Sequence, residues 1–241
     1  MKKIIGLLLV LAIWSLPAMA DSYIKMQDHT DASYGHGNQV PARDSESELW
    51  IGDGRIAFVT ETRRYILDVE NGKAYIMEMA DTAYVETDLP LDNTKIFPPD
   101  YVQRLAMFPI TGELKLLDGK KEIAGKSCRS HMIHFWVDYM NVKYHETEHT
   151  VWVTDDVPFD KKYIDVFIET FLTLHNFKPE LIAQILEAGG WEMLSESVRF
   201  SEGQQILSNS GVIEFEEREP EADTYTIPDG YRKKEFLNPR G

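Results

Sequence analysis

Segments of alternating apolar and polar residues, separated by turn residues, constrain the fold of this 241-residue chain more than any other feature. Alternation with a period of two indicates a strand that buries one face, and Gly, Asp or Asn between such segments indicates a tight turn. Five such segments follow one another in the first half of the chain, at 45–51, 55–60, 62–68, 73–79 and 82–87. Turns this short join antiparallel neighbours, so the sequence predicts an antiparallel meander.

The second half of the chain mixes strands with helices. Further alternating segments predict strands at 112–117, 121–124, 127–138, 141–153, 193–200 and 204–217, with a turn at Asp118-Gly119 between the first two. Apolar residues at helical spacing, or a proline suited to a first turn, predict helices at 99–107, 160–176 and 179–188. Residues 31–44, rich in Gly, Pro and Asp, predict a long loop. The fold class is therefore α+β, with a large antiparallel sheet and helices inserted before its last strands.

The acidic balance of the chain restricts its partners. Forty acidic and 25 basic side chains give a formal net charge of -15. This charge opposes binding to nucleic acid and to bare anionic membrane, and no basic run is long enough to override it. The sequence also lacks a P-loop, a Rossmann glycine fingerprint and a GxSxG nucleophile elbow. We therefore expect a protein that is not an enzyme, with no catalytic residue, no cofactor and no nucleic-acid partner.

The first twenty residues have the pattern of a signal peptide. Lys2-Lys3 precede an apolar run at 4–14, and Ala18-Met19-Ala20 is a small-residue cleavage site before Asp21. The apolar run is shorter than the ~20 residues that span a bilayer, and no later segment reaches that length. We expect residues 1–20 to be removed, leaving a soluble exported protein without a stable membrane anchor. The periplasm is the expected location, and the extracellular medium is the alternative.

Cys128 is the only cysteine, so the chain has no internal disulfide and its core must supply its stability. A free cysteine is most often a small buried apolar residue, which is the expectation here. A reactive thiol and an intermolecular bridge are the alternatives.

Several segments in order carry a family resemblance. They are YILDVENGKAYIMEMADTAYVE at 65–86, KEIAGKSC at 121–128, HTVWVTDDVP at 149–158, the Gly189-Gly190 break and the closing IPDGY at 227–231. The chain resembles bacterial exported proteins of a domain-of-unknown-function family in the LolA/LolB-like lipoprotein-carrier superfamily. The resemblance implies one domain over 21–241, a strongly curved antiparallel half-barrel whose concave face is plugged by helices. In the carriers an apolar cavity holds acyl chains, but no carrier-specific binding residue matches a position in this sequence.

The helix at 160–176 is apolar around most of its circumference, so it must be covered on most sides. It is either a plug facing a sheet cavity or an ordinary core helix. Methionines and aromatic residues on the predicted strands suit an adaptable apolar surface, although core filling is the alternative for each. The candidate ligand-binding residues are Trp50, Phe58, Tyr75, Met77, Met79, Trp136, Trp152, Tyr163, Phe167, Phe171 and Leu174.

Four histidines, at positions 131, 134, 145 and 149, lie close together in the sequence. With a hairpin tip at Tyr139-Met140, His134 pairs with His145 and His131 with Glu148, which makes His134 and His145 a candidate metal site. Partly exposed strand residues are the alternative. The same pair would repel when protonated, so stability would fall below about pH 6. Residues 145–149 match the HExxH pattern of zinc proteases. In those proteases the pattern lies on a helix, whereas the β-branched and aromatic neighbours here predict a strand, which argues against a protease.

The leading functional hypothesis is a soluble periplasmic binding protein whose apolar cavity receives a lipid or other hydrophobic ligand, without catalysis. The first alternative is a metal-binding or pH-sensing envelope protein that uses His134 and His145. The second is a protein-interaction module, with the sheet edge and residues 31–44 as contact surfaces. The protein partner of such a module is not indicated by the sequence.

Overall fold

The computed structural model describes residues 20–35, 38–140, 142–201 and 203–239. The expected signal peptide therefore lies, except for Ala20, outside the described residues. In the part of the chain that the structure describes, no helix is long and apolar enough to cross a membrane.

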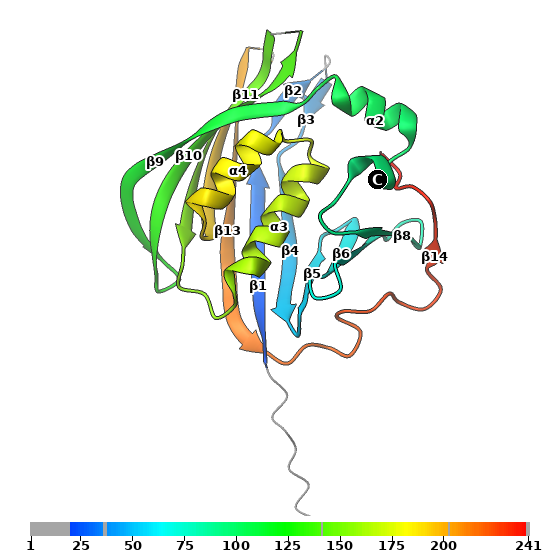
Figure 1. Ribbon diagram of the computed structural model, residues 1–241. Coiled ribbons are helices and arrows are strands. Elements are labelled where there is room, and N and C mark those ends of the chain that lie inside the picture. The colour runs from blue at the N-terminus through cyan, green and yellow to red at the C-terminus, as the bar shows by residue number, and fades with distance from the viewer. Residues whose placement is uncertain (1–19, 36–37, 141, 202, 240–241) are drawn as a thin grey trace, which may run out of the picture.

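Twelve strands form one open sheet in the order β14-β8-β7-β6-β5-β4-β1-β13-β12-β11-β10-β9 (Figure 1). Their bounds are β1 Asp21–Thr30, β4 Arg43–Gly52, β5 Arg55–Val59, β6 Arg63–Asp68, β7 Lys73–Glu78, β8 Ala83–Asp88, β9 Ile110–Ile123, β10 Lys126–Tyr139, β11 Val142–Thr154, β12 Trp191–Ser201, β13 Gln204–Arg218 and β14 Arg232–Lys233. All neighbours are antiparallel except β14 and β8. Open sheets of more than about ten strands curl, and Figure 1 shows this one bent around its helices. The predicted α+β class and curved antiparallel sheet are confirmed.

Four helices interrupt the strands: α1 Asn93–Ile96, α2 Pro99–Ala106, α3 Lys161–Leu174 and α4 Pro179–Ala188. Figure 1 shows α3 and α4 side by side across one face of the sheet, and α4 also lies against β9. We call the face that they cover the concave face, and the opposite face the convex face. The three predicted helices correspond to α2, α3 and α4.

The main core lies on the concave face. Alternate strand residues point to it, and Ile24, Leu49, Ile56, Leu67 and Ile76 are fully buried there. The apolar side chains of α3 pack on the same cluster. Burying such a face is the main stabilising term, at about 25 cal/mol per Å² of apolar surface. Cys128 belongs to this cluster and is 1% exposed, which confirms the expectation of a buried cysteine.

The convex face of β4–β8 is covered by the C-terminal segment, which runs from β13 to the far edge of the sheet (Figure 1). Tyr225 packs on a small cluster of Tyr23, Trp50 and Ala57. Its hydroxyl donates to the Asp21 carboxylate at 2.5 Å, and burial together with this bond raises the pKa of Tyr225. Both faces of this half of the sheet are therefore buried.

On the N-terminal side the structure differs from the sequence prediction in two ways. Residues 31–44 are not one loop, because β2 Ser33–Gly35 and β3 Asn38–Val40 form a short antiparallel pair and β4 already begins at Arg43. Strand β1, which lies between β4 and β13 in the sheet, was not expected. The five meander segments, by contrast, are confirmed as β4 to β8.

The expected turn at Asp118-Gly119 is also wrong, because β9 continues through it. A Cβ at Gly119 would lie 2.4 Å from the Ser130 Oγ and 3.1 Å from the Trp152 ring, so this glycine permits close packing. Residues 117–119 bulge opposite Ser130, since Arg129 pairs with Lys120 but His131 with Leu116. The turn lies instead at Ala124-Gly125, where both residues have positive φ, 49° and 75°.

We expect Ile76→Ala to lower the free energy of unfolding by about 2–5 kcal/mol, because it leaves a cavity in the main core. Denaturant unfolding followed by circular dichroism measures the change. Leu116→Ala is the matched control, since Leu116 is 65% exposed and its truncation removes little buried surface. Equal losses in the two variants would contradict this placement of the core.

Candidate functional site

A cavity of about 510 Å³ lies between the two helices and the concave face. We call it the apolar cavity. Its walls come from α3, α4, the loop between them and strands β1, β4, β5 and β9–β13. The large apolar residues that line it include Phe58, Ile133, Phe135, Phe167, Phe171 and Trp191.

The cavity exists because side-chain size differs across the concave face. On one side, Phe58 meets Phe167 and Phe171 with ring centroids 5.3 and 5.0 Å apart, and Tyr65 meets Phe171 at 4.9 Å. These aromatic contacts hold α3 at a distance from the sheet. Elsewhere the strand lining includes three small residues, Ser47, Ser195 and Ser210, beside larger ones such as Ile133 and Phe135. Serines do not reach the helix, so space remains.

His131 is a buried polar group in the cavity wall. It is 3% exposed, and neither ring nitrogen has a hydrogen bond within the described residues. Burial, followed by the charge of Arg129, lowers the pKa of His131, while the Gly189 carbonyl and Asp155 oppose the shift. The carbonyl lies close to the ring but does not form a hydrogen bond of normal geometry. The lowered pKa favours the neutral imidazole, which has one donor and one acceptor nitrogen.

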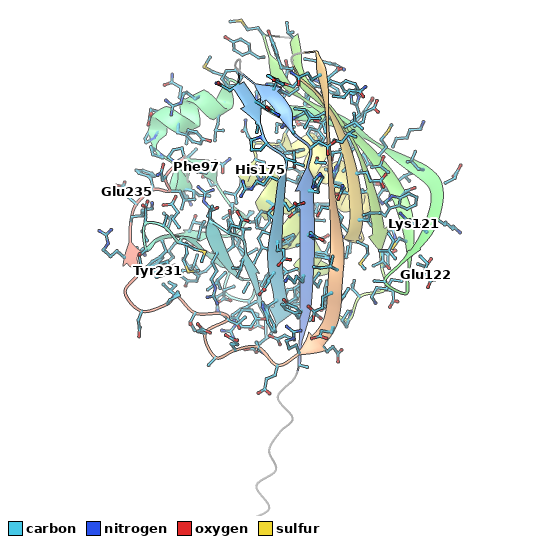
Figure 2. All side chains as sticks on the ribbon, turned by 180° about the vertical axis from the view of Figure 1, so that it is seen from behind. Phe97, Lys121, Glu122, His175, Tyr231 and Glu235 are labelled. Carbon is cyan, nitrogen blue, oxygen red and sulfur yellow. The ribbon has the colours of Figure 1, made fainter. Side chains whose placement is uncertain are left out.

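Two other histidines line the apolar cavity. The Nδ1 of His149 lies 2.5 Å from the Ser197 Oγ. Serine hydrolases use a serine in contact with a histidine, but their sites also need a third group that orients the imidazole. Within the described residues no carboxylate hydrogen-bonds to His149. The His175 side chain has an exposed surface, but protein atoms surround much of its ring. This desolvation, followed by the charge of Arg63, lowers the pKa of His175. Figure 2 labels the residue.

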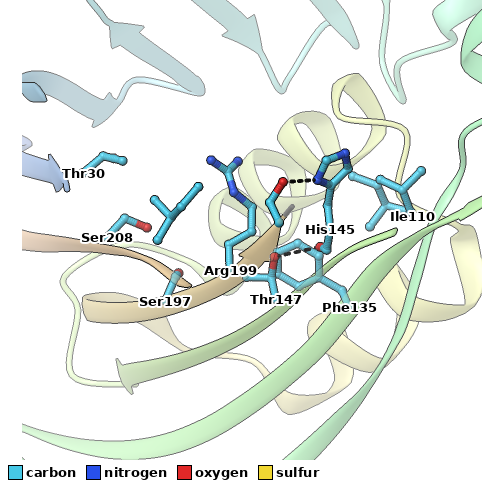
Figure 3. A pocket seen from close by; sticks show the side chains of 11 residues that line it. Thr30, Ile110, Phe135, His145, Thr147, Ser197, Arg199 and Ser208 are labelled. Carbon is cyan, nitrogen blue, oxygen red and sulfur yellow. Dashed lines mark hydrogen bonds between the residues drawn. The ribbon is translucent and has the colours of Figure 1, made fainter. Parts of the chain in front are cut away.

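A second pocket of about 520 Å³, which we call the polar pocket, adjoins the apolar cavity, and Phe135 lines both (Figure 3). In it the His145 Nδ1 lies 3.0 Å from the Ser201 Oγ, and the Thr147 hydroxyl donates to the His145 carbonyl at 3.2 Å. The Arg199 side chain lies among these groups.

The two pockets follow one ladder of paired residues across β11, β12, β13 and β1. Thr147 pairs with Arg199, and Arg199 with Ile206, in the polar pocket. The next rung runs from His149 through Ser197 and Ser208 to Thr30. The third runs from Val151 through Ser195 and Ser210 to Asp28 in the apolar cavity. The concave face thus changes from polar to apolar along the strands.

Of the eleven residues predicted to bind ligand, Phe58, Phe167 and Phe171 line the apolar cavity. Leu174 packs in the main core, and Tyr163 lines a separate surface pocket beside the end of β13. Trp152 also packs against the main core rather than lining the cavity, with the Lys121 ammonium 5.4 Å from its ring centroid.

The other five lie away from the cavity. Trp50 is on the convex face with Tyr23. Tyr75 and Met77 alternate with Ala74 and Ile76 of the main core, so they also face the convex side, and Met79 follows the end of β7 and is exposed. Trp136 contacts the ring of His134 and the ammonium of Lys143.

The predicted pairing of His134 with His145 is wrong. His134 pairs with Glu148 and His131 with Val151, because the hairpin pairs Tyr139 with Val142 and its register shifts by one further residue between Phe135 and Val137. His145 has a φ of 53° at this bulge and points into the polar pocket beside Phe135, whereas His134 alternates with Phe135 and faces away. The expected cross-strand repulsion therefore has no structural basis. Among the described residues no group of three or more His, Cys, Asp or Glu side chains could hold a metal ion.

Most of the polar lining was missed from the sequence: Asp28, Ser47, His131, His149, His175, Ser195 and Ser210. One signal was available. Serines occupy every second position at 195–197 and 208–210, which is the spacing of one strand face. Small polar residues on the face that should fill a core indicate a face that is not filled.

No protein-family model matches this sequence, and no curated protein matches it. Among solved structures, PNGF-II is similar at 10% identity with a TM-score of 0.41; the match covers 90% of this chain and 31% of that one. This chain therefore spans about a third of the PNGF-II chain. Similar structures also include a DUF1329 family protein from Desulfovibrio piger, at 9% identity, a TM-score of 0.28, and coverage of 87% and 90% of the two chains.

A putative outer membrane lipoprotein-sorting protein domain from Vibrio parahaemolyticus is similar at 7% identity with a TM-score of 0.30; the match covers 85% of this chain and 89% of that one. The last two structures are of the two kinds that the sequence resembles, a domain-of-unknown-function family and a lipoprotein-sorting domain. With every TM-score below 0.5, these similarities carry no argument about ligand or activity.

We expect stability to fall in acid because of His131. Its pKa in the folded protein lies below the ordinary value of 6.5, so below that pH the unfolded chain binds a proton that the folded chain does not. This stabilisation is complete above pH 6.5 and is lost as the pH falls, by at most about 1.4 kcal/mol per pH unit.

Urea unfolding of the wild type and His131→Gln at about pH 7.5 and about pH 5 measures this contribution. The wild type should lose more stability than His131→Gln, whereas His134→Gln, the control, should behave as the wild type. An equal loss in wild type and His131→Gln would contradict the assignment.

Proposed function

We propose that this chain is an exported, non-catalytic binding protein that holds a lipid or other hydrophobic ligand in the apolar cavity. The observation that carries the proposal is a cavity of about 510 Å³ between α3, α4 and the sheet, with aromatic and aliphatic walls. Small-molecule sites are typically concave, mostly apolar and about 300–1,000 Å³ in volume, with a few polar groups that fix orientation.

The physical driving force is burial of apolar ligand surface, at about 25 cal/mol per Å², and no covalent step is required. An apolar wall without a ligand exposes aromatic surface to water or leaves it without contacts, and both cost free energy. An acyl chain or a similar apolar group restores those contacts.

Export to the periplasm is part of the proposal. It is supported by the basic, apolar and small-residue pattern of residues 1–20. The first strand begins at Asp21, directly after the expected cleavage position, so removal of the signal peptide leaves the sheet intact.

We expect Leu172→Trp to weaken binding of N-phenylnaphthylamine, an uncharged apolar dye, by about tenfold or more. Leu172 lines the cavity from α3, so a larger ring there must either occupy the ligand's space or strain the packing by about 1–3 kcal/mol. Dye fluorescence in a titration gives the dissociation constant. Leu207→Trp is the matched control, because it makes the same change at a side chain that is 48% exposed.

Circular dichroism establishes that both variants are folded. If Leu172→Trp and Leu207→Trp bind the dye equally well, the dye does not enter the apolar cavity and the proposal fails.

A further inference from the structure

We infer that the ligand is an amphiphile with an anionic head, whose head binds Arg199 and His145 in the polar pocket while its chain occupies the apolar cavity. This inference rests on the proposed function and names the class of ligand. The shared chemistry of the head is an oxyanion, a carboxylate or a phosphate.

The first argument is the charge of the polar pocket. The chain carries a formal net charge of -15, yet among the residues that the structure describes no Asp or Glu lines this pocket. Its polar lining consists of Arg199, His145 and five Ser and Thr hydroxyls. Arginine together with hydroxyl donors is a common arrangement for binding carboxylate and phosphate oxygens. An acidic protein that keeps carboxylates out of one pocket leaves that pocket suited to an anion.

The second argument is that Arg199 has no acidic partner. Arg43, Arg55 and Arg129 each form an ion pair with a carboxylate, whereas the Arg199 side chain has no ion pair or hydrogen bond within the described residues. Its guanidinium presents five N–H donors in a planar fork, which can bind an oxyanion through two parallel hydrogen bonds. Figure 3 shows the group between Ser208 and the His145–Ser201 pair.

The third argument is continuity between the two compartments. Phe135 lines both, and Ser197 of the polar pocket contacts His149 of the apolar cavity. Arg199 and Ser195 point to the same face of β12, four residues apart, which is about 13 Å at ~3.3 Å per residue. A head at Arg199 can therefore continue into a chain above Ser195.

The orientation follows from the remaining charges. The apolar cavity is lined by Asp28 and Glu192 but by no lysine or arginine among the described residues. An anionic head inside it would meet carboxylates of the same sign, while an apolar chain is not repelled. The head is therefore placed in the polar pocket and the chain beside α3.

The test compares ligands with one chain and different heads. Calorimetric titrations of the delipidated protein use dodecanoate, dodecyl phosphate, dodecanol and inorganic phosphate. We expect the two anionic amphiphiles to bind at least about tenfold more tightly than dodecanol, since a hydrogen-bonded charge adds to burial of the same chain. Inorganic phosphate alone should bind far more weakly, because it has no chain to bury.

The variant Arg199→Gln should remove the advantage of the anionic heads and leave dodecanol binding unchanged. Arg199→Lys should retain part of the advantage, because the charge stays but the planar fork is lost. Arg232→Gln is the matched control, since it removes one positive charge from β14, at the opposite end of the sheet.

Four results would overturn the inference. Equal affinity for dodecanoate and dodecanol, or an anionic preference that survives in Arg199→Gln, would contradict the head site and leave the proposed function standing. Inorganic phosphate binding as tightly as dodecyl phosphate would make the pocket a free-anion site. If no chain-bearing ligand binds, the proposed function fails, and the inference fails with it.

Discussion

The structure depends on one geometric constraint: α3 and α4, two short helices, cover much of the concave face of a twelve-stranded sheet, while α1 and α2 add Ile96 and Tyr101 to the same core. Helix α3 has 14 residues and α4 has 10, while the strands that they face reach 15 residues. Aromatic contacts from Phe58 and Tyr65 to α3 fix the height of the helix on one side. The cavity lining also includes three serines, Ser47, Ser195 and Ser210, whose short side chains leave space beneath the helices.

Polarity then varies along the strands rather than across them. The rung of Thr147, Arg199 and Ile206 lies in the polar pocket, and the rung that contains Ser195 and Ser210 lies under the apolar cavity. A ligand with one polar end and one apolar end matches this order, whereas a purely apolar ligand would leave the polar pocket empty of partners. The formal net charge of -15 disfavours docking on anionic membranes.

The sequence predicted the meander and the helices well, because period-two alternation and helical spacing are local signals. It could not predict which face of a strand meets the cavity. Both faces of β4–β8 are buried, one by α3 and the other by the C-terminal segment. Tyr75 and Met77 therefore have side chains suited to an apolar ligand, but they lie on the convex face, away from the cavity.

The sequence also could not predict the register in which neighbouring strands pair. The hairpin pairs Tyr139 with Val142, which already separates His134 from His145, and the shift between Phe135 and Val137 then places His134 opposite Glu148. Gly119 is a second example. The sequence predicted a turn at Asp118-Gly119, whereas in the structure this glycine permits close packing on Trp152. Neither feature has a local sequence signal, since each depends on how neighbouring strands pair and not on the residues of one strand alone.

The most direct test of the central claim is native mass spectrometry of the protein purified from its own host without detergent. The account predicts a bound amphiphile at one molecule per chain, with an oxyanion head and a single apolar chain identified after extraction. It also predicts that this mass is absent from Leu172→Trp and present in Leu207→Trp. A wild-type protein that carries no organic ligand, together with an experimental structure in which side chains fill the space beneath α3, would contradict it.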